Sequence, residues 1–266
     1  MGDGISETID AFHRGRFHII QPKGRGHRAG MDAMLLASLV ADDRACRIAD
    51  LGAGAGAAGM AVAARLENAE VTLYERSPEM AEFARRSLEL SENSAFSARV
   101  NVRKADVTLR AKARAEAGLP DDYFHHVIMN PPYNDAGDRR TPDALKAEAH
   151  AMTEGLFEDW IRTAGAIMVP GGQLSLISRP QSVAEIIAAC GSRFGGMEIT
   201  LIHPRPGEDA VRMLVTAIKG SRARLSFRAP LIMHETGSHA FTPFVDDLNN
   251  GRAAYSRNVR AIRSAS

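Results

Sequence analysis

Short apolar stretches alternate with longer amphipathic stretches from about residue 46 to residue 219. Apolar runs rich in β-branched residues predict strands at residues 47–51, 70–74, 100–103, 126–129, 173–177, 198–203 and 212–219. Runs with apolar residues at helical spacing predict helices at 57–66, 78–92, 145–168 and 182–190. Alternating strands and helices are typical of an α/β fold, in which a mostly parallel sheet carries helices on both faces.

The last two predicted strands are joined by residues 204–209, which contain two prolines and a glycine but no helical pattern. A parallel pair needs a long crossover, so this short link predicts an antiparallel hairpin at the edge of the sheet. Residues 1–30, 134–144 and 220–266 lie outside the pattern, apart from two possible short strands at 225–228 and 231–234. We therefore expect an N-terminal segment with a covering helix (1–45), a core (46–220) and a C-terminal extension with a basic tail (221–266) within a single domain.

The composition narrows the class of partner. With 45% hydrophobic residues and a net charge of +1, the chain has no overall field that attracts nucleic acid or a membrane, so a polyanion must bind a local basic patch. The longest apolar run, residues 33–41, is far shorter than the roughly 20 residues that span a bilayer. The N-terminus also lacks a signal-peptide pattern, and we expect a cytoplasmic protein. No metal is expected, because the two cysteines, Cys46 and Cys190, and the pair of adjacent histidines, His125 and His126, lack the spacing of metal ligands.

A glycine-rich turn follows the first predicted strand and leads into the first predicted helix. It contains Asp50, Gly52, Gly54 and Gly56. Glycines let a ligand approach the backbone, and the start of the helix offers N–H groups, so the turn predicts a cofactor site. Gly54-x-Gly56-x-x-Gly59 also satisfies the dinucleotide fingerprint, which leaves an NAD-dependent oxidoreductase as an alternative. Asp50 favours a cofactor with an amino-acid moiety, because its carboxylate could hold an ammonium group but would repel a pyrophosphate.

Two further acidic residues follow the next two predicted strands. Glu75 could accept both hydroxyls of a ribose, and Asp106 could accept the amine of an adenine. In an open parallel sheet the ligand crevice lies beyond the carboxyl ends of the strands. We therefore expect both carboxylates to lie near the glycine-rich turn.

Asn130-Pro131-Pro132-Tyr133 ends the fourth predicted strand and should reach the same crevice. The prolines remove two N–H donors, so the segment presents mainly carbonyl acceptors. If the Asn130 side chain and the Pro131 carbonyl accept the two hydrogens of a planar amine, its lone pair becomes localised and available to a methyl group. Tyr133 could stack on a planar substrate, as expected for a base turned out of its stack. The tetrapeptide therefore predicts methylation of a weakly nucleophilic NH2 group, achieved by placement and charge localisation.

In their order and spacing, these motifs resemble the class I methyltransferases that use S-adenosylmethionine (SAM) to methylate amino groups. The resemblance rests on Asp50-x-Gly52-x-Gly54-x-Gly56, Glu75, Asp106 and Asn130-Pro131-Pro132-Tyr133. It implies a Rossmann-like fold with a seven-stranded, mostly parallel sheet whose last strand is antiparallel, helices on both faces, and SAM as the cofactor. It does not separate the N6 atom of adenine from the N5 atom of glutamine as the acceptor.

The segment before the first predicted strand favours adenine. Residues 26–37, with Arg28 and Asp32, resemble the corresponding segment of bacterial tRNA1(Val) adenine N6-methyltransferases. That resemblance implies that Asp32 caps a helix covering the methionine end of SAM, so that Asp32 joins Asn130 among the cofactor-binding residues. Glutamine-methylating relatives usually carry a helical N-terminal domain, for which the sequence before the turn leaves no room.

Three groups of basic residues are candidates for RNA contact. They comprise Lys23, Arg25, His27 and Arg28; then Arg99, Arg103, Lys104, Arg110, Lys112 and Arg114; and finally Arg252, Arg257, Arg260 and Arg263. Arg139 and Arg140 follow the Asn-Pro-Pro-Tyr motif. From these we expect Lys23, Arg25, Arg28, Arg139 and Arg140 to bind the substrate.

The leading hypothesis is a SAM-dependent N6-methyltransferase that acts on an adenine in RNA, specifically adenosine 37 of tRNA1(Val). A second hypothesis is a protein glutamine N5-methyltransferase acting on a release factor or a similar protein. The motifs are also compatible with an N6-methyltransferase for a different adenine in RNA or DNA, and with a SAM-binding regulator without activity. An NAD-dependent oxidoreductase would use the glycine-rich turn but would leave Asn130-Pro131-Pro132-Tyr133 without a role.

Overall fold

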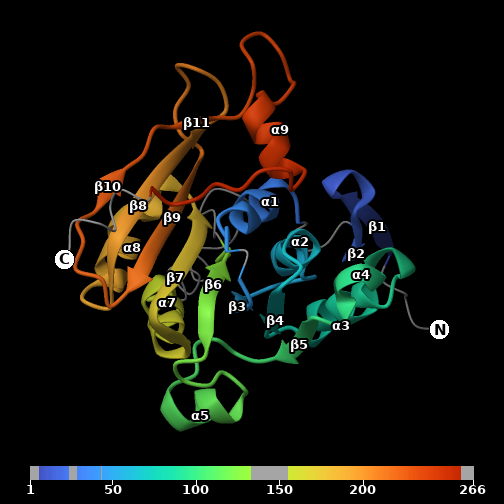
Figure 1. The fold of residues 1–266 in the computed structure, drawn as a ribbon, viewed down its shortest axis with the longest axis vertical. Helices are drawn as coiled ribbons and strands as arrows, with labels where there is room; N and C mark the ends of the chain where they lie inside the picture. Colours follow the sequence, from blue (N-terminus) through green and yellow to red (C-terminus); the bar gives the residue numbers. More distant parts are fainter. Residues whose placement is uncertain (1–5, 24–28, 43, 133–154, 259–266) are drawn as a thin grey trace, which may run out of the picture.

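The computed structural model describes residues 6–23, 29–42, 44–132 and 155–258. Within these ranges the chain forms a nine-stranded sheet and a separate two-stranded sheet (Figure 1). The large sheet contains β3 (Cys46–Leu51), β4 (Ala69–Glu75), β5 (Val100–Lys104), β6 (Phe124–Met129), β7 (Met168–Ser178), β8 (Phe194–His203), β9 (Arg212–Lys219), β10 (Ser226–Phe227) and β11 (Leu231–Ile232).

All seven predicted core strands are present, in the order β5-β4-β3-β6-β7-β9-β8 across the sheet. The first five strands of this series are parallel, whereas β9 is antiparallel to both β7 and β8. The expected α/β fold with an antiparallel last strand is therefore confirmed. The predicted hairpin position was only partly right. β9 lies inside the sheet between its neighbours, and the outer edge of β8 pairs with β10 and β11, which cover its unpaired backbone groups.

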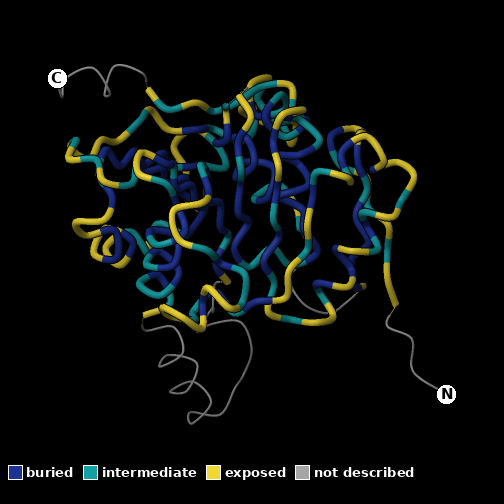
Figure 2. Tube along the Cα trace, turned by 60° about the horizontal axis from the view of Figure 1, so that its bottom comes forward, coloured by how far each residue is buried: buried dark blue, intermediate teal, exposed yellow. Residues whose placement is uncertain are grey.

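Helices cover both faces of the sheet (Figures 1 and 2). They are α1 (Met31–Ser38), α2 (Ala57–Arg65), α3 (Pro78–Leu88), α4 (Ser94–Ser97), α5 (Ala111–Glu116), α7 (Leu156–Ile167), α8 (Val183–Cys190) and α9 (Pro243–Asn249). Successive residues of a strand point to opposite faces, so the buried side chains form two clusters. Ile48 and Ile128 pack with α1, α2 and α3, whereas Ala49 and Val127 pack with α7 and α8.

The N-terminal segment departs most clearly from the prediction. Residues expected to lie outside the regular pattern form a hairpin of β1 (Glu7–Phe12) and β2 (Phe17–Pro22). β2 is almost entirely buried and packs against α3. Apolar and polar residues alternate over only a few positions in β1, and charged residues surround them, so the sequence did not predict this hairpin. The apolar surface on which β2 packs is distant in the sequence.

Several helix bounds also differ from those predicted. The helix expected at 78–92 ends at Leu88, and a 3-10 turn (Ser91–Asn93) follows it before α4. The helix expected at 145–168 is observed as α7, and the first part of that prediction lies outside the described residues. Among the described residues, no helix combines the length and apolar character needed to cross a membrane.

Candidate active site

A cavity of about 580 Å³ lies at the carboxyl ends of β3, β4, β5 and β6. It brings together most of the predicted site residues, namely Asp32, Asp50, Gly52, Gly54, Glu75, Asp106, Asn130, Pro131 and Pro132. Gly56 does not line it. Gly56 instead begins α2 with a left-handed backbone (φ +92°), packed against Leu73 and Met60. Tyr133, Arg25, Arg28, Arg139 and Arg140 lie outside the described residues.

The glycine-rich turn is held against the end of β4. The N–H groups of Gly52 and Ala53 donate to the Tyr74 carbonyl at 2.8 and 3.0 Å. The Gly54 N–H donates to Oε2 of Glu75 at 2.8 Å, and Oε1 of Glu75 accepts from the Ser77 N–H at 2.7 Å. A carboxylate oxygen can accept more than one hydrogen bond, so Glu75 can support the turn and still accept the hydroxyls of a ribose.

Asp50 lies beneath this turn with its carboxyl group buried. Its side chain is at the cavity wall, the residue is 2% exposed, and Oδ2 accepts from the Gly59 N–H at 2.9 Å. Burial raises the pKa of the carboxyl group to about 7, against the opposing effect of the Gly59 hydrogen bond. Such a carboxyl group would be stabilised in its ionised form by a cationic ligand, which agrees with the ammonium-binding role expected for it.

Asp106 and Asn130 line the cavity from β5 and β6. Oδ1 of Asp106 accepts from both the N–H and the hydroxyl of Thr108, at 2.9 and 2.7 Å, which fixes the carboxylate at the cavity wall. Asn130 follows the last residue of β6 and is partly exposed, and the next residue, Pro131, is buried. The predicted amine-binding segment therefore adjoins the predicted cofactor residues.

Trp160 is both a core residue and a cavity residue. It lies in α7, is 7% exposed and lines the cavity. A Cβ atom on Gly52 would lie only 2.3 Å from Cη2 of its indole ring. The glycine is therefore required by close packing as well as by its positive φ of +69°. The helical spacing of Trp160 indicates burial but carries no signal that its ring touches the turn.

Sequence reasoning missed a basic part of the cavity and gave Asp32, which does line the cavity, the wrong role at the start of α1. Arg179, which follows β7, and Arg212, the first residue of β9, both line the cavity. Asp32 does not cap α1, since the helix begins after Gly30 and shows no side-chain cap. Its Oδ2 instead accepts from Nε of Arg212 at 2.8 Å. No local pattern around Arg212 could have indicated this pair, because the two residues are 180 positions apart.

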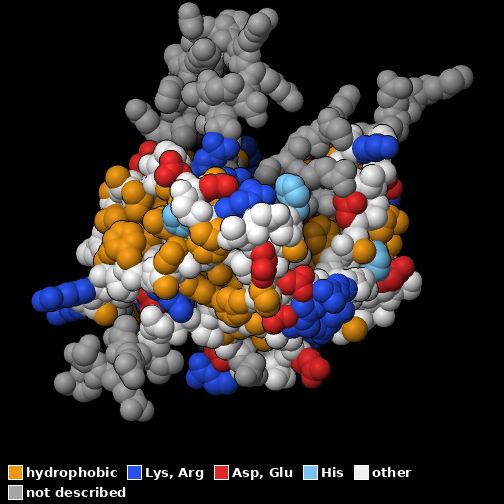
Figure 3. All heavy atoms as spheres, turned by 90° about the horizontal axis from the view of Figure 1, so that it is seen from above, with side chains coloured by type: hydrophobic (Ala, Val, Ile, Leu, Met, Phe, Trp, Pro, Cys, Tyr) orange, Lys and Arg blue, Asp and Glu red, His pale blue; other side chains and the backbone are white. Residues whose placement is uncertain are grey.

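Most described members of the three predicted basic groups are engaged within the fold. Arg99 donates to backbone carbonyls of the α2–β4 connection, and Arg114 is buried and pairs with Asp121. Arg252 pairs with Asp246 and Asp247 in and next to α9. In Figure 3 the visible face mixes acidic, basic and hydrophobic side chains and shows no continuous basic surface among the described residues. Lys23, which follows β2, is exposed and does not line the cavity of about 580 Å³.

Arg257 is likewise a structural residue. Its guanidinium donates to the Thr216 hydroxyl and the Gly196 carbonyl and lies 3.6 Å from the buried Glu198. Burial lowers its pKa from the usual arginine value. These contacts tie the C-terminal extension to β8 and β9, so Arg257 supports the fold and is not available for RNA contact.

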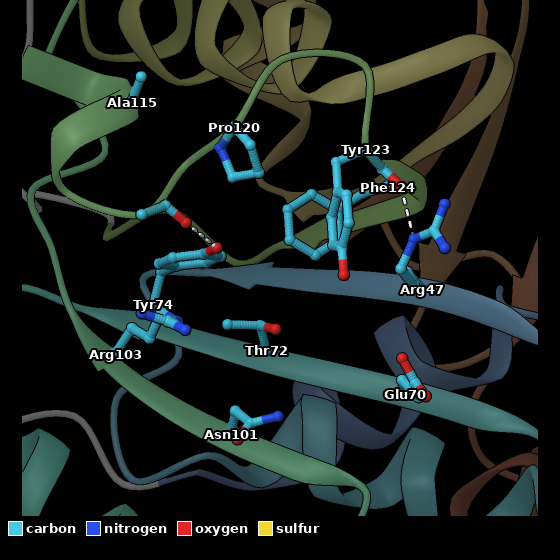
Figure 4. A pocket seen from close by; sticks show the side chains of 11 residues that line it. Arg47, Glu70, Thr72, Tyr74, Asn101, Arg103, Ala115, Pro120, Tyr123 and Phe124 are labelled. Carbon is cyan, nitrogen blue, oxygen red and sulfur yellow. Dashed lines mark hydrogen bonds between the residues drawn. The ribbon is translucent and has the colours of Figure 1, made fainter. Parts of the chain in front are cut away.

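A second cavity, of about 380 Å³, runs along β4 and β5 beneath the α5–β6 connection (Figure 4). Arg47 lies over the ring of Tyr123 at 4.3 Å, and the Tyr74 hydroxyl donates to the Gly118 carbonyl at 2.6 Å. None of the predicted cofactor-binding or catalytic residues that the structure describes lines this cavity. The first cavity is therefore the candidate active site.

The residues of the first cavity fit SAM. Its volume falls within the range of ligand sites, roughly 300–1,000 Å³. Three carboxylates line one half of it, at the ends of β3, β4 and after β5, where they match an ammonium group, a ribose and an adenine amine. Asp50 is 2% exposed, accepts from the Gly59 N–H and lies at the cavity wall, so its carboxyl group is the one that would hold the ammonium group of SAM.

Comparison with known proteins gives consistent matches. A family model described as the methyltransferase small domain matches residues 29–200. The crystal structure of a predicted O-methyltransferase from Agrobacterium tumefaciens superposes on this chain with a TM-score of 0.77. The two sequences are 83% identical, and the match covers 86% of this chain and 100% of the chain in that structure.

Two curated relatives differ in the substrates they are named for. The tRNA1(Val) (adenine(37)-N6)-methyltransferase of Pedobacter heparinus is 27% identical over 211 residues, which are 77% of this chain and 83% of the relative. The release factor glutamine methyltransferase of Deinococcus radiodurans is 32% identical over 149 residues, which are 53% of this chain and 49% of the relative.

Proposed function

We propose that this chain, which belongs to the methyltransferase small domain family, methylates the N6 amine of an adenine in RNA. Membership of the family confirms the expected SAM-dependent methyltransferase and contradicts the alternative of an NAD-dependent oxidoreductase. The proposal depends on one observation above all. Asn130 and Pro131 directly follow β6 and lie at the wall of the same cavity as the glycine-rich turn, Glu75 and Asp106.

The segment at the end of β6 would act on the acceptor by hydrogen bonding alone. SAM supplies an electrophilic methyl group on a positively charged sulfur. The Asn130 side-chain oxygen and the Pro131 carbonyl would accept the two N–H groups of the adenine amine, which directs the nitrogen lone pair out of the ring plane. The nitrogen lone pair would form the new C–N bond as the methyl–sulfur bond breaks, S-adenosylhomocysteine would leave, and the nitrogen would then release one proton to water. In this proposal Tyr133, which lies outside the described residues, stacks on the base.

The wider comparison supports adenine over the other acceptors. The match to the tRNA1(Val) adenine-37 enzyme extends over most of both chains, whereas the match to the glutamine methyltransferase covers about half of each. We therefore propose adenosine 37 of tRNA1(Val) as the specific acceptor. A glutamine amide also carries two N–H groups and remains the second candidate. An O-methyl acceptor would bring only one hydrogen to the two carbonyl acceptors of Asn130 and Pro131.

The decisive experiment is transfer of a tritium-labelled methyl group from SAM to separate acceptors. Total tRNA, ribosomal RNA, DNA and release factors are incubated with the enzyme, and labelled nucleosides or amino acids are then identified. We expect N6-methyladenosine from tRNA. Label only in protein or only in DNA would refute the proposal, and label only in ribosomal RNA would refute its tRNA part.

A variant of Asn130 separates catalysis from cofactor binding. Asn130→Ala removes one of the two proposed acceptors and should lower the transfer rate about 100-fold or more, a far larger change than any in SAM affinity measured by calorimetry. An unchanged rate would show that Asn130 has no part in the chemistry. Intact SAM binding without any transfer by the wild type to any acceptor would favour a regulator without activity.

A further inference from the structure

One wall of the candidate active site comes from the chain that precedes the glycine-rich turn. We call residues 29–33, at the start of α1, the N-terminal wall. Four of them line the cavity, namely Ala29, Gly30, Asp32 and Ala33. α1 packs against α2, whose first two residues also line this cavity. The N-terminal wall therefore lies beside the glycine-rich turn, in the part of the cavity that fits SAM.

The first turn of α1 is not fixed by the helix itself. The N–H groups at the start of a helix have no partners within it, and a capping side chain usually satisfies one of them. Gly30 precedes α1 and offers no side chain, and no side chain among the described residues caps the helix. The ion pair of Asp32 with Arg212 holds one end of the N-terminal wall. Its other end, at Ala29, depends on the β1–β2 hairpin.

Gln21, in β2, holds the Ala29 end of the N-terminal wall. The residue is 1% exposed and lines the cavity. Its Oε1 accepts from the Ala29 N–H at 2.8 Å, and its Nε2 donates to Oδ2 of Asp10, in β1, at 2.8 Å. A backbone N–H can only donate and an ionised carboxylate can only accept, so this place requires one side chain with both an acceptor and a donor. The amide of glutamine meets both requirements.

The strand that carries Gln21 is itself attached to the core. The Ile20 N–H donates to the hydroxyl of Ser87, in α3, at 2.8 Å, and this hydrogen bond is buried. A continuous series of contacts therefore runs from α3 through β2 and Gln21 to the N-terminal wall.

We infer that Gln21 is a positioning residue, which holds the N-terminal wall in the place where SAM binds. Because its two hydrogen bonds order the wall in the free protein, SAM binding does not have to supply the entropy cost of ordering it. The inference concerns the cofactor, so it does not depend on whether adenine or glutamine accepts the methyl group.

The test measures the binding of S-adenosylhomocysteine to the full chain by calorimetry. Gln21→Met replaces the amide by an unbranched apolar side chain of similar length, so the dissociation constant should rise about ten-fold. Without ligand, the backbone N–H groups of residues 29–33 should exchange with solvent faster than in the wild type, while those of β3 and β4 keep their protection. Saturating S-adenosylhomocysteine should restore the protection of residues 29–33.

Thr8→Val is the matched control. Thr8 lies opposite Gln21 in the hairpin and also donates to Oδ2 of Asp10, at 3.3 Å, but it does not line the cavity. Valine keeps the branched shape that suits a strand. The affinity of this variant for S-adenosylhomocysteine and the exchange of its residues 29–33 should match those of the wild type.

An unchanged dissociation constant in Gln21→Met would overturn the inference. Exchange that becomes faster in β3 and β4 as much as in residues 29–33 would also overturn it, because the effect would then be a general loss of stability. If Gln21→Met does not fold, Asp10→Ala on the partly exposed strand β1 decides. It removes the acceptor that orients Gln21 and should raise the dissociation constant about three-fold, whereas a value equal to that of Thr8→Val would refute the inference.

Failure of the proposed acceptor has a different signature. A wild type that labels only release factors would refute adenine as the acceptor, and the binding and exchange results for Gln21→Met would still support the positioning role.

Discussion

At the scale of single residues, Gly52 shows how closely the cofactor turn is packed. An alanine there would adopt a φ of +69° and would place its Cβ atom 2.3 Å from Cη2 of Trp160. Gly54 has a similar φ of +58°, but the nearest atom to its virtual Cβ is Cε of Met80 at 3.8 Å. An alanine at Gly54 would therefore suffer backbone strain alone, whereas an alanine at Gly52 would suffer both backbone strain and steric overlap.

We predict that Gly52→Ala lowers the free energy of unfolding by about 2–4 kcal/mol, and Gly54→Ala by about 1–2 kcal/mol. The measurement is urea denaturation of both variants without ligand. Adding Trp160→Phe should recover part of the loss in Gly52→Ala, because the shorter ring withdraws from the turn. Equal losses for the two glycine variants would show that contact with Trp160 is unimportant.

Asp50 gives the folded protein a pH dependence with a definite sign. In the unfolded chain its carboxyl group ionises near the usual pKa of 3.8, whereas burial raises the pKa to about 7 in the fold. Between these values the folded state keeps a proton that the unfolded state has released. The contribution of Asp50 to stability is therefore fully present below about pH 4 and is lost as the pH rises to about 7.

We predict that Asp50→Asn, which keeps an acceptor for the Gly59 N–H, abolishes this contribution. The difference in unfolding free energy between variant and wild type, measured without ligand from pH 4 to 8, should shift in favour of the variant as the pH rises. SAM affinity of the wild type should increase up to about pH 7 as Asp50 ionises, and that of Asp50→Asn should be weaker and flatter. A constant stability difference across this range would contradict the raised pKa.

At the scale of elements, the backbone of β2 is hydrogen-bonded to two buried side chains of the core, Asn93 and Ser87. Asn93 is 0% exposed, and its amide nitrogen donates to the carbonyls of His18 and Ser87 at 2.7 and 2.6 Å. Its Oδ1 accepts from the His18 N–H at 2.9 Å. Ile20, also in β2, donates its N–H to the Ser87 hydroxyl at 2.8 Å. β2 thus pairs with β1 and also bonds to the side chains of Ser87 in α3 and of Asn93 shortly after it.

Removing this attachment should loosen the hairpin. Asn93→Ala leaves an N–H and two carbonyls without their partner, so we expect a loss of about 2–4 kcal/mol in unfolding free energy and faster hydrogen exchange in β1 and β2. Ser91→Ala, an exposed position in the same turn, should change stability by less than about 0.5 kcal/mol. Unchanged exchange in β2 of the Asn93 variant would mean that packing alone holds the hairpin.

At the scale of the whole molecule, the cavity spans residues from β2 to β9, so a bound cofactor should stabilise the fold as a unit. At a concentration of SAM 100 times its dissociation constant we expect about 2.7 kcal/mol of stabilisation and a rise in Tm of about 5–10 °C. NADH at the same concentration should have no effect. Glu75→Gln should reduce the shift, because it weakens the acceptor for the ribose. Protection by NADH and not by SAM would contradict the assignment of the cofactor.

Local patterns were enough to predict the core of the fold and much of the cofactor half of the site. Hydrophobic alternation located the strands, since the side-chain period of a strand is read within a few residues. The ends of β3, β4, β5 and β6 lie along one edge in a parallel sheet, so Asp50, Glu75, Asp106 and Asn130 could be grouped before their positions were known. The N-terminal hairpin escaped prediction, because β2 is stabilised by Ser87 and Asn93 and not by a local signal.

By itself, the sequence determined the α/β class, the predicted strand that each motif follows, and the chemistry of the cofactor turn. Each of these depends on residues close together in the chain. Only the tertiary structure decided which charges meet across the cavity. Asp32 forms an ion pair with Arg212, 180 positions away, and the indole ring of Trp160 packs against Gly52. Such contacts depend on how distant elements pack, and no local spacing encodes them.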